Sequence, residues 1–306
     1  MGCDVIGLGL RCLDITVRVG SLLSRDRGHE ALEIAIQGGG PAGTAAVAAA
    51  RLGIRAGYVG TVGSGDLGEL KYRALVDYGV DLRGLIRRDA PEHQVALVFV
   101  SDASGERSFM PNRGLREAPL LVSELNRDYL TAADILIIDG FHSEAAFAAA
   151  GWMRSAGKEV LMDLQKPECD ITPEMLRLVS LSDIFICGEG GLQVVTGIEK
   201  PLQAGRKVLS MGARIVVETW GERGCMTVTS GEHFITPAFP VQAVNTTGAG
   251  DVFHGAYAVG MLEGMDLRAT ARFASAAAAL TCTKMSGFDR IPDRAAVERL
   301  LQGRVG

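Results

Sequence analysis

The segment from Asn245 to Ala256 carries the residues whose types and order best suit catalysis. It reads Asn-Thr-Thr-Gly-Ala-Gly-Asp-Val-Phe-His-Gly-Ala, so that a glycine-rich turn opens an expected helix. The first N–H groups of a helix have no partner within it, and the helix dipole adds partial positive charge, so this turn favours an anion. Asp251 stands in the first turn, where its carboxylate can take a proton from an attacking hydroxyl or simply stabilise the helix end.

Two other glycine-rich segments are candidate ligand sites. Residues 219–224, Thr-Trp-Gly-Glu-Arg-Gly, follow an expected strand, and ligands bind at the carboxyl ends of strands in open α/β sheets. A hairpin turn would use the same glycines. Residues 38–43, Gly-Gly-Gly-Pro-Ala-Gly, precede an alanine-rich stretch, and the plain alternative there is a flexible loop before a helix.

Composition and missing motifs exclude several classes of protein. The chain has 306 residues, of which 47% are hydrophobic and 22% charged, so it is not intrinsically disordered. The sequence has no G-x-x-x-x-G-K-[ST] motif, which excludes a P-loop NTPase. Gly7-Leu-Gly9 lacks the third glycine of the dinucleotide fingerprint, so an NAD-dependent oxidoreductase is a distant alternative.

Charge, cysteines and the N-terminus indicate the setting of the protein. The net charge of −5 gives no basic footprint for nucleic acid. The six cysteines are scattered without a C-x-x-C pair, so neither a zinc site nor a disulfide framework is expected. No signal peptide and no run of about 18 apolar residues are visible. We therefore expect a soluble, cytoplasmic protein without nucleic-acid or membrane partners.

The elements that must position these residues alternate between apolar strands and helices. Such alternation is typical of βαβ units and a mainly parallel sheet. Helices are expected at 44–52, at 67–78 with Asp66 as the cap, and at 143–156, 250–263 and 267–283. Strands are expected at Val5–Leu8, Ala56–Val59, Ile135–Ile138, Glu159–Met162, Ile184–Ile186, Ile215–Glu218 and Cys225–Val228.

Two segments have a different pattern. Residues 13–36 and 93–110 contain alternating apolar and polar runs without helix signals, which suits a sheet with one solvated face. We interpret them as a small antiparallel lid, at about residues 12–37 and 93–115, that stands off the α/β core. No repeat or Pro-rich linker interrupts the chain, so residues 1–306 are expected to form a single domain.

Together these segments resemble the ribokinase (PfkB-type) family of carbohydrate kinases. The resemblance runs from the strand and acid at 7–14 through GGGPAGTAAVAAARLG at 38–53, VGSGDLG at 62–68 and YGVDL at 78–82. It continues through residues 219–224 and TTGAGDVFHGA at 246–256, and closes at Ile291-Pro-Asp. The family fold is a Rossmann-like α/β core, a mainly parallel sheet with helices on both faces, plus a small β-sheet lid.

The resemblance implies ATP-dependent phosphoryl transfer to a hydroxyl of a sugar or sugar derivative. Asp251 aligns with the catalytic base of the family, and the amides of Gly248, Ala249 and Gly250 align with its anion hole. The nucleotide side is aligned with Thr219, Gly221, Gly224 and Gly250, and the adenine pocket with residues 276–280 and 284–287. The acceptor side is aligned with Asp14, Gly39, Gly40 and Gly43, and Arg107 of the expected lid is a further candidate for binding the substrate.

Several positions depart from the family pattern. Gly43 stands where the family usually has Asn. Gly188 and Gly191 replace the Asn-x-x-Glu motif that organises Mg²⁺, which leaves Glu189 as the nearby carboxylate for a metal. Mg²⁺ is still expected with ATP, because it keeps several waters and needs few protein ligands. Asn245 replaces an Asp that helps to build a monovalent-cation site in some members, so a role for K⁺ is uncertain.

Within the family, the motifs look most like the sulfofructose kinase branch. A sulfonate acceptor would need cationic or dense N–H donors near the substrate, and four side chains are candidates for this role. They are Arg107, Arg113, His29 and His142, while the arginine expected next to Phe141 is Gly140. A sulfosugar is therefore not assigned.

Two alternatives to a sugar kinase remain. One is a nucleoside kinase of the same fold. The other is a sugar- or nucleotide-binding protein that has lost catalysis, which the departures at 188, 191 and 245 suggest. The intact Gly-Ala-Gly-Asp motif argues against the second, because a binding protein has no chemical need for Asp251. The resemblance further implies a homodimer through the lid and closure of the lid over the acceptor.

Overall fold

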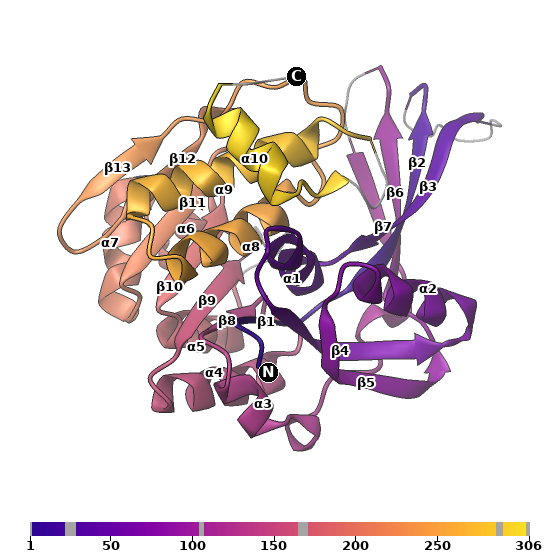
Figure 1. The fold of residues 1–306 in the computed structure, drawn as a ribbon, viewed down its shortest axis with the longest axis horizontal. Helices are drawn as coiled ribbons and strands as arrows, with labels where there is room; N and C mark the ends of the chain where they lie inside the picture. Colours follow the sequence, from indigo (N-terminus) through magenta and orange to yellow (C-terminus); the bar gives the residue numbers. More distant parts are fainter. Residues whose placement is uncertain (1, 22–28, 104–106, 165–170, 286–289, 304–306) are drawn as a thin grey trace.

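Two β-sheets of different size organise the chain in the computed structural model (Figure 1), which describes residues 2–21, 29–103, 107–164, 171–285 and 290–303. The large sheet has the order β13-β12-β11-β10-β9-β8-β1-β4-β5, parallel from β11 to β5 and antiparallel at β12 and β13. Its strands are β1 (Val5–Leu8), β4 (Ala56–Ser64), β5 (Asp81–Pro91), β8 (Ile135–Ile138), β9 (Glu159–Leu164), β10 (Ile184–Gly188), β11 (Ile215–Thr219), β12 (Cys225–Val228) and β13 (His233–Thr236).

Helices cover both faces of the large sheet. In β8, Leu136 and Ile138 pack into the apolar cluster on one face, while Ile135 and Ile137 pack into the cluster on the other. This explains why the central strands are apolar at every position. The helices are α1 (Pro41–Arg51), α2 (Gly65–Val76), α3 (Arg127–Thr131), α4 (Ser143–Ser155), α5 (Pro173–Leu181), α6 (Gly191–Thr196), α7 (Pro201–Met211), α8 (Ala249–Leu262), α9 (Leu267–Cys282) and α10 (Arg294–Leu301). None of these described helices has the length and hydrophobicity that crossing a bilayer requires.

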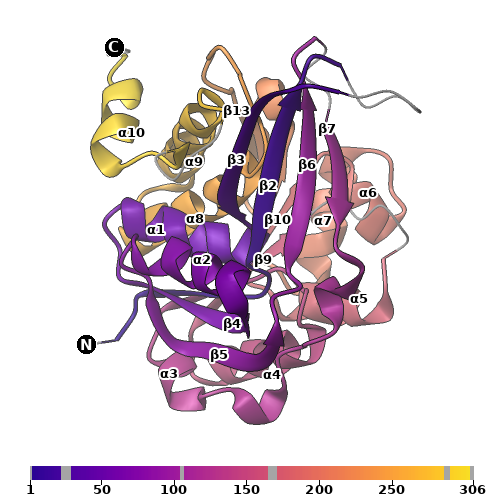
Figure 2. The same ribbon diagram turned by 90° about the vertical axis from the view of Figure 1, so that its right-hand side faces the viewer.

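The small sheet corresponds to the predicted lid and stands apart from the large sheet (Figure 2). Its order is β3-β2-β6-β7, formed by β2 (Cys12–Val19), β3 (Ala31–Gly39), β6 (Val95–Ser101) and β7 (Arg107–Pro111). The prediction of an antiparallel sheet is wrong in one pair, because β2 and β6 are parallel. They follow β1 and β5, which run in the same direction in the large sheet, so the chain enters the small sheet twice with the same polarity.

The expected fold class and most of the expected elements are confirmed. Strands β1, β8 and β12 have the predicted bounds, and β4 continues to Ser64. The predicted cap of α2 is wrong: the helix begins at Gly65 after Ser64, and Asp66 lies inside its first turn. The elements that were not predicted are α3, α5, α6, α7, α10, β5 and β13, which are mostly short or, like β5, rich in charged residues at a sheet edge.

Close packing of α1 against α8 brings two glycine-rich turns together. Gly255 in α8 has no room for a side chain, because a Cβ atom there would lie 2.4 Å from the carbonyl oxygen of Ala45. The two helices therefore approach at backbone distance. Their first turns, which begin at Pro41 and Ala249, thereby come near one another beside the small sheet.

Candidate active site

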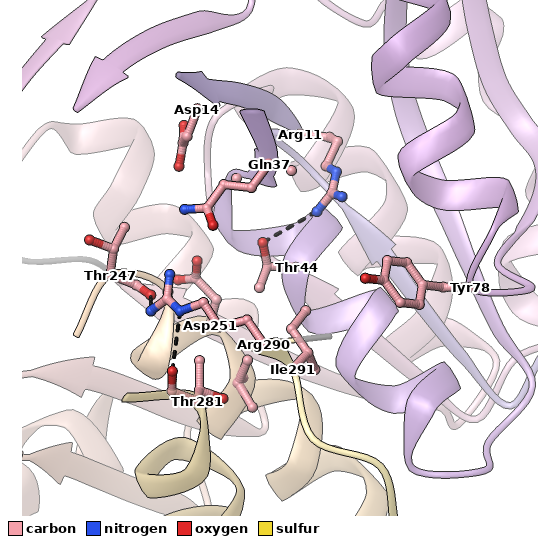
Figure 3. A pocket seen from close by; sticks show the side chains of 14 residues that line it. Arg11, Asp14, Gln37, Thr44, Tyr78, Thr247, Asp251, Thr281, Arg290 and Ile291 are labelled. Atoms are coloured by element: carbon pink, nitrogen blue, oxygen red, sulfur yellow. Dashed lines mark hydrogen bonds between the residues drawn. The ribbon is translucent and has the colours of Figure 1, made fainter. Parts of the chain in front are cut away.

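A first cavity lies between the small sheet and the first turns of α1 and α8 (Figure 3). Asp14 and Gln37 enter it from β2 and β3, Thr44 from α1 and Asp251 from α8. Segments that are far apart in the sequence, from Arg11 to Ile291, thus meet at one site.

Asp251 is a buried carboxyl in the first turn of α8, and it lines the first cavity. Burial raises its pKa to about 7, and the nearby Asp163 carboxyl raises it further, while His254 opposes this shift. A carboxylate with a pKa near the working pH is suited to accept a proton. The geometry thus permits the general-base role that the resemblance implies.

A second acid that sequence analysis did not select lies behind Asp251. Asp163, at the carboxyl end of β9, is fully buried, and its Oδ1 atom lies 3.3 Å from Nε2 of His254. Burial raises the pKa of Asp163 well above its usual value and lowers that of His254. Burial therefore favours the neutral form of both groups.

The turn before α8 presents main-chain N–H groups. Gly248 is the N-cap residue, with a left-handed φ of 74°. The Ala249 amide donates to the carbonyl of Thr246 at 3.3 Å, whereas the amides of Gly248 and Gly250 have no hydrogen bond to another described residue. Of the three amides predicted for an anion hole, these two are thus the ones open to a ligand.

Arg290 holds the loop that leads into this turn, and sequence analysis did not identify it. Its guanidinium donates to the carbonyl of Thr281 at 3.2 Å, to that of Asn245 at 2.9 Å and to that of Thr247. The side chain of Asn245 adds a bond from its Nδ2 atom to the Met285 carbonyl at 2.8 Å. The positive charge of Arg290 therefore binds main-chain carbonyl groups of the loop directly before the anion-binding turn.

On the acceptor side, Asp14 and Gly39 line the first cavity, but Gly40 and Gly43 do not. Asp14 is buried, which raises its pKa, and Oδ1 accepts a hydrogen bond from the Cys12 thiol at 3.2 Å. Gly40 has a left-handed φ of 85°. Gly43 faces the side chain of Arg11: a Cβ atom at position 43 would lie 2.4 Å from Cδ of that arginine.

Asp139 anchors the segments that form this side. Its carboxylate, at the end of β8, accepts hydrogen bonds from the amides of Leu10 at 2.8 Å, Ala42 at 3.2 Å and Phe141 at 2.9 Å. Burial raises its pKa to about 6, although these bonds oppose the shift. Asp139 therefore links the loop before β2 to the start of α1, and its place directly after an apolar strand was the available sequence signal.

A second cavity lies on the other side of the same turn. It brings together the four residues predicted for the nucleotide, and its remaining wall is largely apolar, as an adenine ring requires. Ala278 and Ala279, from the predicted adenine segment, are part of that wall, while residues 286–287 lie outside the described residues. The four are Thr219, Gly221, Gly224 and Gly250.

The residue predicted for a metal lines neither cavity. Glu189 is exposed and forms an ion pair with Arg223 at 2.7 Å. Within the described part of the chain, no group of three or more His, Cys, Asp or Glu side chains is arranged to hold a metal ion.

The basic residues considered for a sulfonate do not converge on the first cavity. His29, Arg113 and His142 are not part of its wall, and the side chain of Arg107 lies outside the described residues. His142 is buried, which lowers its pKa to about 4, and its Nδ1 atom accepts a hydrogen bond from the Leu120 amide. The basic side chains that do line the cavity are Arg11 and Arg290.

Comparison with known proteins gives one consistent result. Residues 4–294 match the sequence family described as "pfkB family carbohydrate kinase". Probable fructokinase-4 of Arabidopsis thaliana is 30% identical over 288 residues, covering 87% of each chain. The 5-dehydro-2-deoxygluconokinase of Clostridium tetani is 26% identical over 274 residues, covering 83% of this chain and 80% of that protein.

A solved structure agrees with these sequence relatives. The ribokinase of Arabidopsis thaliana, determined in complex with ribose and ATP, superposes with a TM-score of 0.86 at 27% identity over 99% of both chains. The arrangement of the large and small sheets is therefore shared over the full length.

Proposed function

The chain belongs to the pfkB family of carbohydrate kinases, and from this premise we propose that it transfers the γ-phosphoryl group of ATP to a hydroxyl of a sugar derivative held beside Asp14 and Asp251. That it is an ATP-dependent sugar kinase follows from the family. The observation that carries the residue assignments is the position of the α8 turn. Gly248 and Asp251 line the first cavity, and Ala249 and Gly250 line the second.

In the proposed reaction, Asp251 accepts the proton of the acceptor hydroxyl as its oxygen attacks the γ-phosphorus. The bond between that phosphorus and the β,γ-bridging oxygen breaks, and ADP leaves. The amides of Gly248 and Gly250 donate to the transferred group as its charge shifts, and Arg290 keeps their loop in place. Such catalysis depends mainly on positioning and electrostatics. Mg²⁺ bound to ATP would neutralise phosphate charge.

On the acceptor side, Asp14 accepts hydrogen bonds from neighbouring sugar hydroxyls. Gly39 stands next to this carboxylate, where a Cβ atom would lie 2.2 Å from Oδ2. Any side chain at position 39 would therefore displace Asp14. We assign Gly43 a different role from the polar contact of the family, namely to make room for Arg11.

The test is ADP release from Mg-ATP across ketoses, aldoses, sugar acids, a sulfosugar and nucleosides. Asp251→Asn should lower kcat by roughly 10²–10⁴-fold, because the general base is lost. Asp66→Asn is the matched control, since Asp66 also lies in the first turn of a helix but is exposed, and it should react normally. Equal rates for Asp251→Asn and the native enzyme would refute the base assignment, and a preference for nucleosides would favour the nucleoside kinase. ATP binding without turnover of any acceptor would favour a binding protein.

We also propose that the chain forms a homodimer through the outer face of the small sheet. In register across this face lie Ile36, Ile15, Leu97 and Met110, all at least partly exposed. Ile34 in the neighbouring row is 65% exposed. An apolar row of this kind is typical of a surface that another chain covers.

The likeness to the sulfofructose kinase branch remains a prediction.

A further inference from the structure

We propose that the acceptor carries an anionic group, a carboxylate, phosphate or sulfonate, and that Arg11 binds it. The inference rests on the proposed function, because it concerns the acceptor in the first cavity. It adds the chemical class of that acceptor and a residue that selects it.

Arg11 is a buried cation in the wall of the first cavity. The residue is only 2% exposed and lies between β1 and β2, and Figure 3 shows its side chain extending toward Thr44. Nη2 donates to the carbonyl of Ala74 at 3.1 Å, and Nη1 lies 3.4 Å from Oγ1 of Thr44, at the outer limit of a hydrogen bond. Nε is buried and has no hydrogen-bond partner. Part of the donor capacity of the guanidinium is thus unused.

No carboxylate within the described part of the chain forms an ion pair with Arg11. The pairs that are present involve other cations, among them Lys71, which is engaged with Glu92 at 3.1 Å. Asp14 attracts Arg11 electrostatically but lies beyond ion-pair distance. Because arginine stays protonated in proteins, a buried guanidinium without an anion is costly. An anionic ligand would supply the missing partner.

The surrounding glycines indicate that this place is reserved for a guanidinium. A Cβ atom at Gly38 would lie 1.7 Å from Nη2 of Arg11, and one at Gly43 would lie 2.4 Å from its Cδ. Neither Gly38 nor Gly43 has a positive φ. Glycine is therefore needed at these positions because the Arg11 side chain leaves no room for a Cβ atom, and not because of the backbone conformation. Where a side chain at position 43 could offer a neutral contact, this chain places a positive charge.

The second arginine of the cavity does not share this role. Arg290 donates to the carbonyls of Asn245, Thr247 and Thr281, so its charge is engaged with the main chain. Asp14 and Asp251 place negative charge in the same cavity. They lie where hydroxyls are needed, whereas Arg11 defines a separate position for the anion.

The experiment compares neutral acceptors with anionic partners of similar skeleton. We would use fructose with fructose 6-phosphate and with 6-deoxy-6-sulfofructose, and glucose with gluconate. For each, kcat/KM is measured with Mg-ATP, and binding without nucleotide is measured by calorimetry. The variants are Arg11→Met, Arg11→Lys and the control Arg73→Met, an exposed arginine of α2. ATP affinity of each variant confirms that it is folded.

We expect the native enzyme to prefer at least one anionic acceptor over its neutral partner. Arg11→Met should reduce this preference on the order of 10–100-fold, the range for a hydrogen bond to a charged group. Arg11→Lys should restore part of it, and Arg73→Met should retain all of it. A preference for neutral sugars, an equal loss for both classes, or no binding of any anionic probe would overturn the inference. Anion binding that depends on Arg11 without turnover would instead uphold it and count against the kinase reaction.

Discussion

Asp251 is one of four buried carboxyls that interact electrostatically, and it lines the first cavity together with Asp14. Burial raises the pKa of Asp251, and Asp163, Asp14 and Asp139 raise it further. Asp163 is more completely buried than Asp251 and lacks a hydrogen bond to either oxygen, and its burial raises its own pKa well above the usual value. Asp251 therefore titrates near neutral pH, where its ionised form can accept the proton of an acceptor hydroxyl.

The pH dependence of the reaction follows from this pKa. If Asp251 is the base, it must be ionised in the free enzyme, and its pKa is about 7. We expect kcat/KM to increase about tenfold per pH unit below pH 7 and to level off above it. The measurement is a pH–rate profile at fixed ionic strength with the best acceptor. A profile that is flat from pH 5 to pH 8 would contradict this.

The ionisation of Asp251 that the reaction needs should also lower the free energy of unfolding. The pKa of Asp251 is raised above its unfolded value of 3.8, so its ionisation destabilises the folded chain as pH rises from about 4 to about 7. Asn does not ionise. Asp251→Asn should therefore be stabilised relative to the native protein at pH 8 by on the order of 2–3 kcal/mol more than at pH 5. Urea denaturation at both pH values measures this, and a difference that does not change with pH would exclude it.

Arg290 supplies a fixed positive charge to the loop before α8. Arg290→Met would leave the carbonyls of Asn245 and Thr247 without their donor, at a cost of roughly 1–3 kcal/mol for each unsatisfied group. We expect lower thermal stability together with lower kcat.

Because the Arg290 guanidinium already supplies a cation to this loop, native turnover should be the same in K⁺ and in choline buffers. Strong activation by K⁺ would show that a further cation site exists.

At the scale of elements, a buried polar network joins the small sheet to the core. Glu92, in the connection between β5 and β6, pairs with Lys71 of α2 and accepts from the amides of Gly63 and Gln94. The Gln94 side chain donates a hydrogen bond to the hydroxyl of Thr61 in β4. Both charged side chains are almost fully buried. This network fixes the point where the chain enters the small sheet for the second time.

Removing one charge of the Lys71–Glu92 pair should lower the free energy of unfolding strongly. Lys71→Met leaves Glu92 buried without its cation, and we expect a loss of about 3–5 kcal/mol in the free energy of unfolding. Adding Glu92→Gln should recover part of that loss, because the uncompensated charge disappears. Urea denaturation of the two single variants and the double variant gives the coupling. Strictly additive losses would mean that the two side chains do not interact.

At the scale of the whole molecule, the outer face of the small sheet is apolar. Ile34→Asp places a charge on this face, in the edge strand β3, and we expect it to convert the proposed dimer into a monomer in light scattering at micromolar concentration. Ile235→Asp is the matched control, since Ile235 in β13 is similarly exposed, at 62%, but lies on the large sheet. Dissociation by the control alone would place the interface elsewhere, and a native monomer would rule out the dimer.

The sequence by itself determined the class of the fold and the motif of the site, because both depend on neighbours along the chain. Apolar strands that alternate with helices predict a mainly parallel sheet, and the run from Thr246 to Asp251 predicts an anion-binding helix start. The glycines that follow β11 are equally local. Each of these signals lies within one element, so it can be read without knowledge of the rest of the molecule.

Only the tertiary structure decided which distant residues complete the site. Arg11 meets Thr44 across 33 positions, and Arg290 meets Asn245 across 45. No sequence periodicity identifies either arginine. By sequence, Gly43 lacks the polar contact that the family usually has at this position, and only the folded structure shows that Arg11 lies against it. The parallel pairing of β2 with β6 is likewise set by the direction of β1 and β5 in the large sheet. Long-range packing determines these features, because their partners are neighbours only in the folded chain.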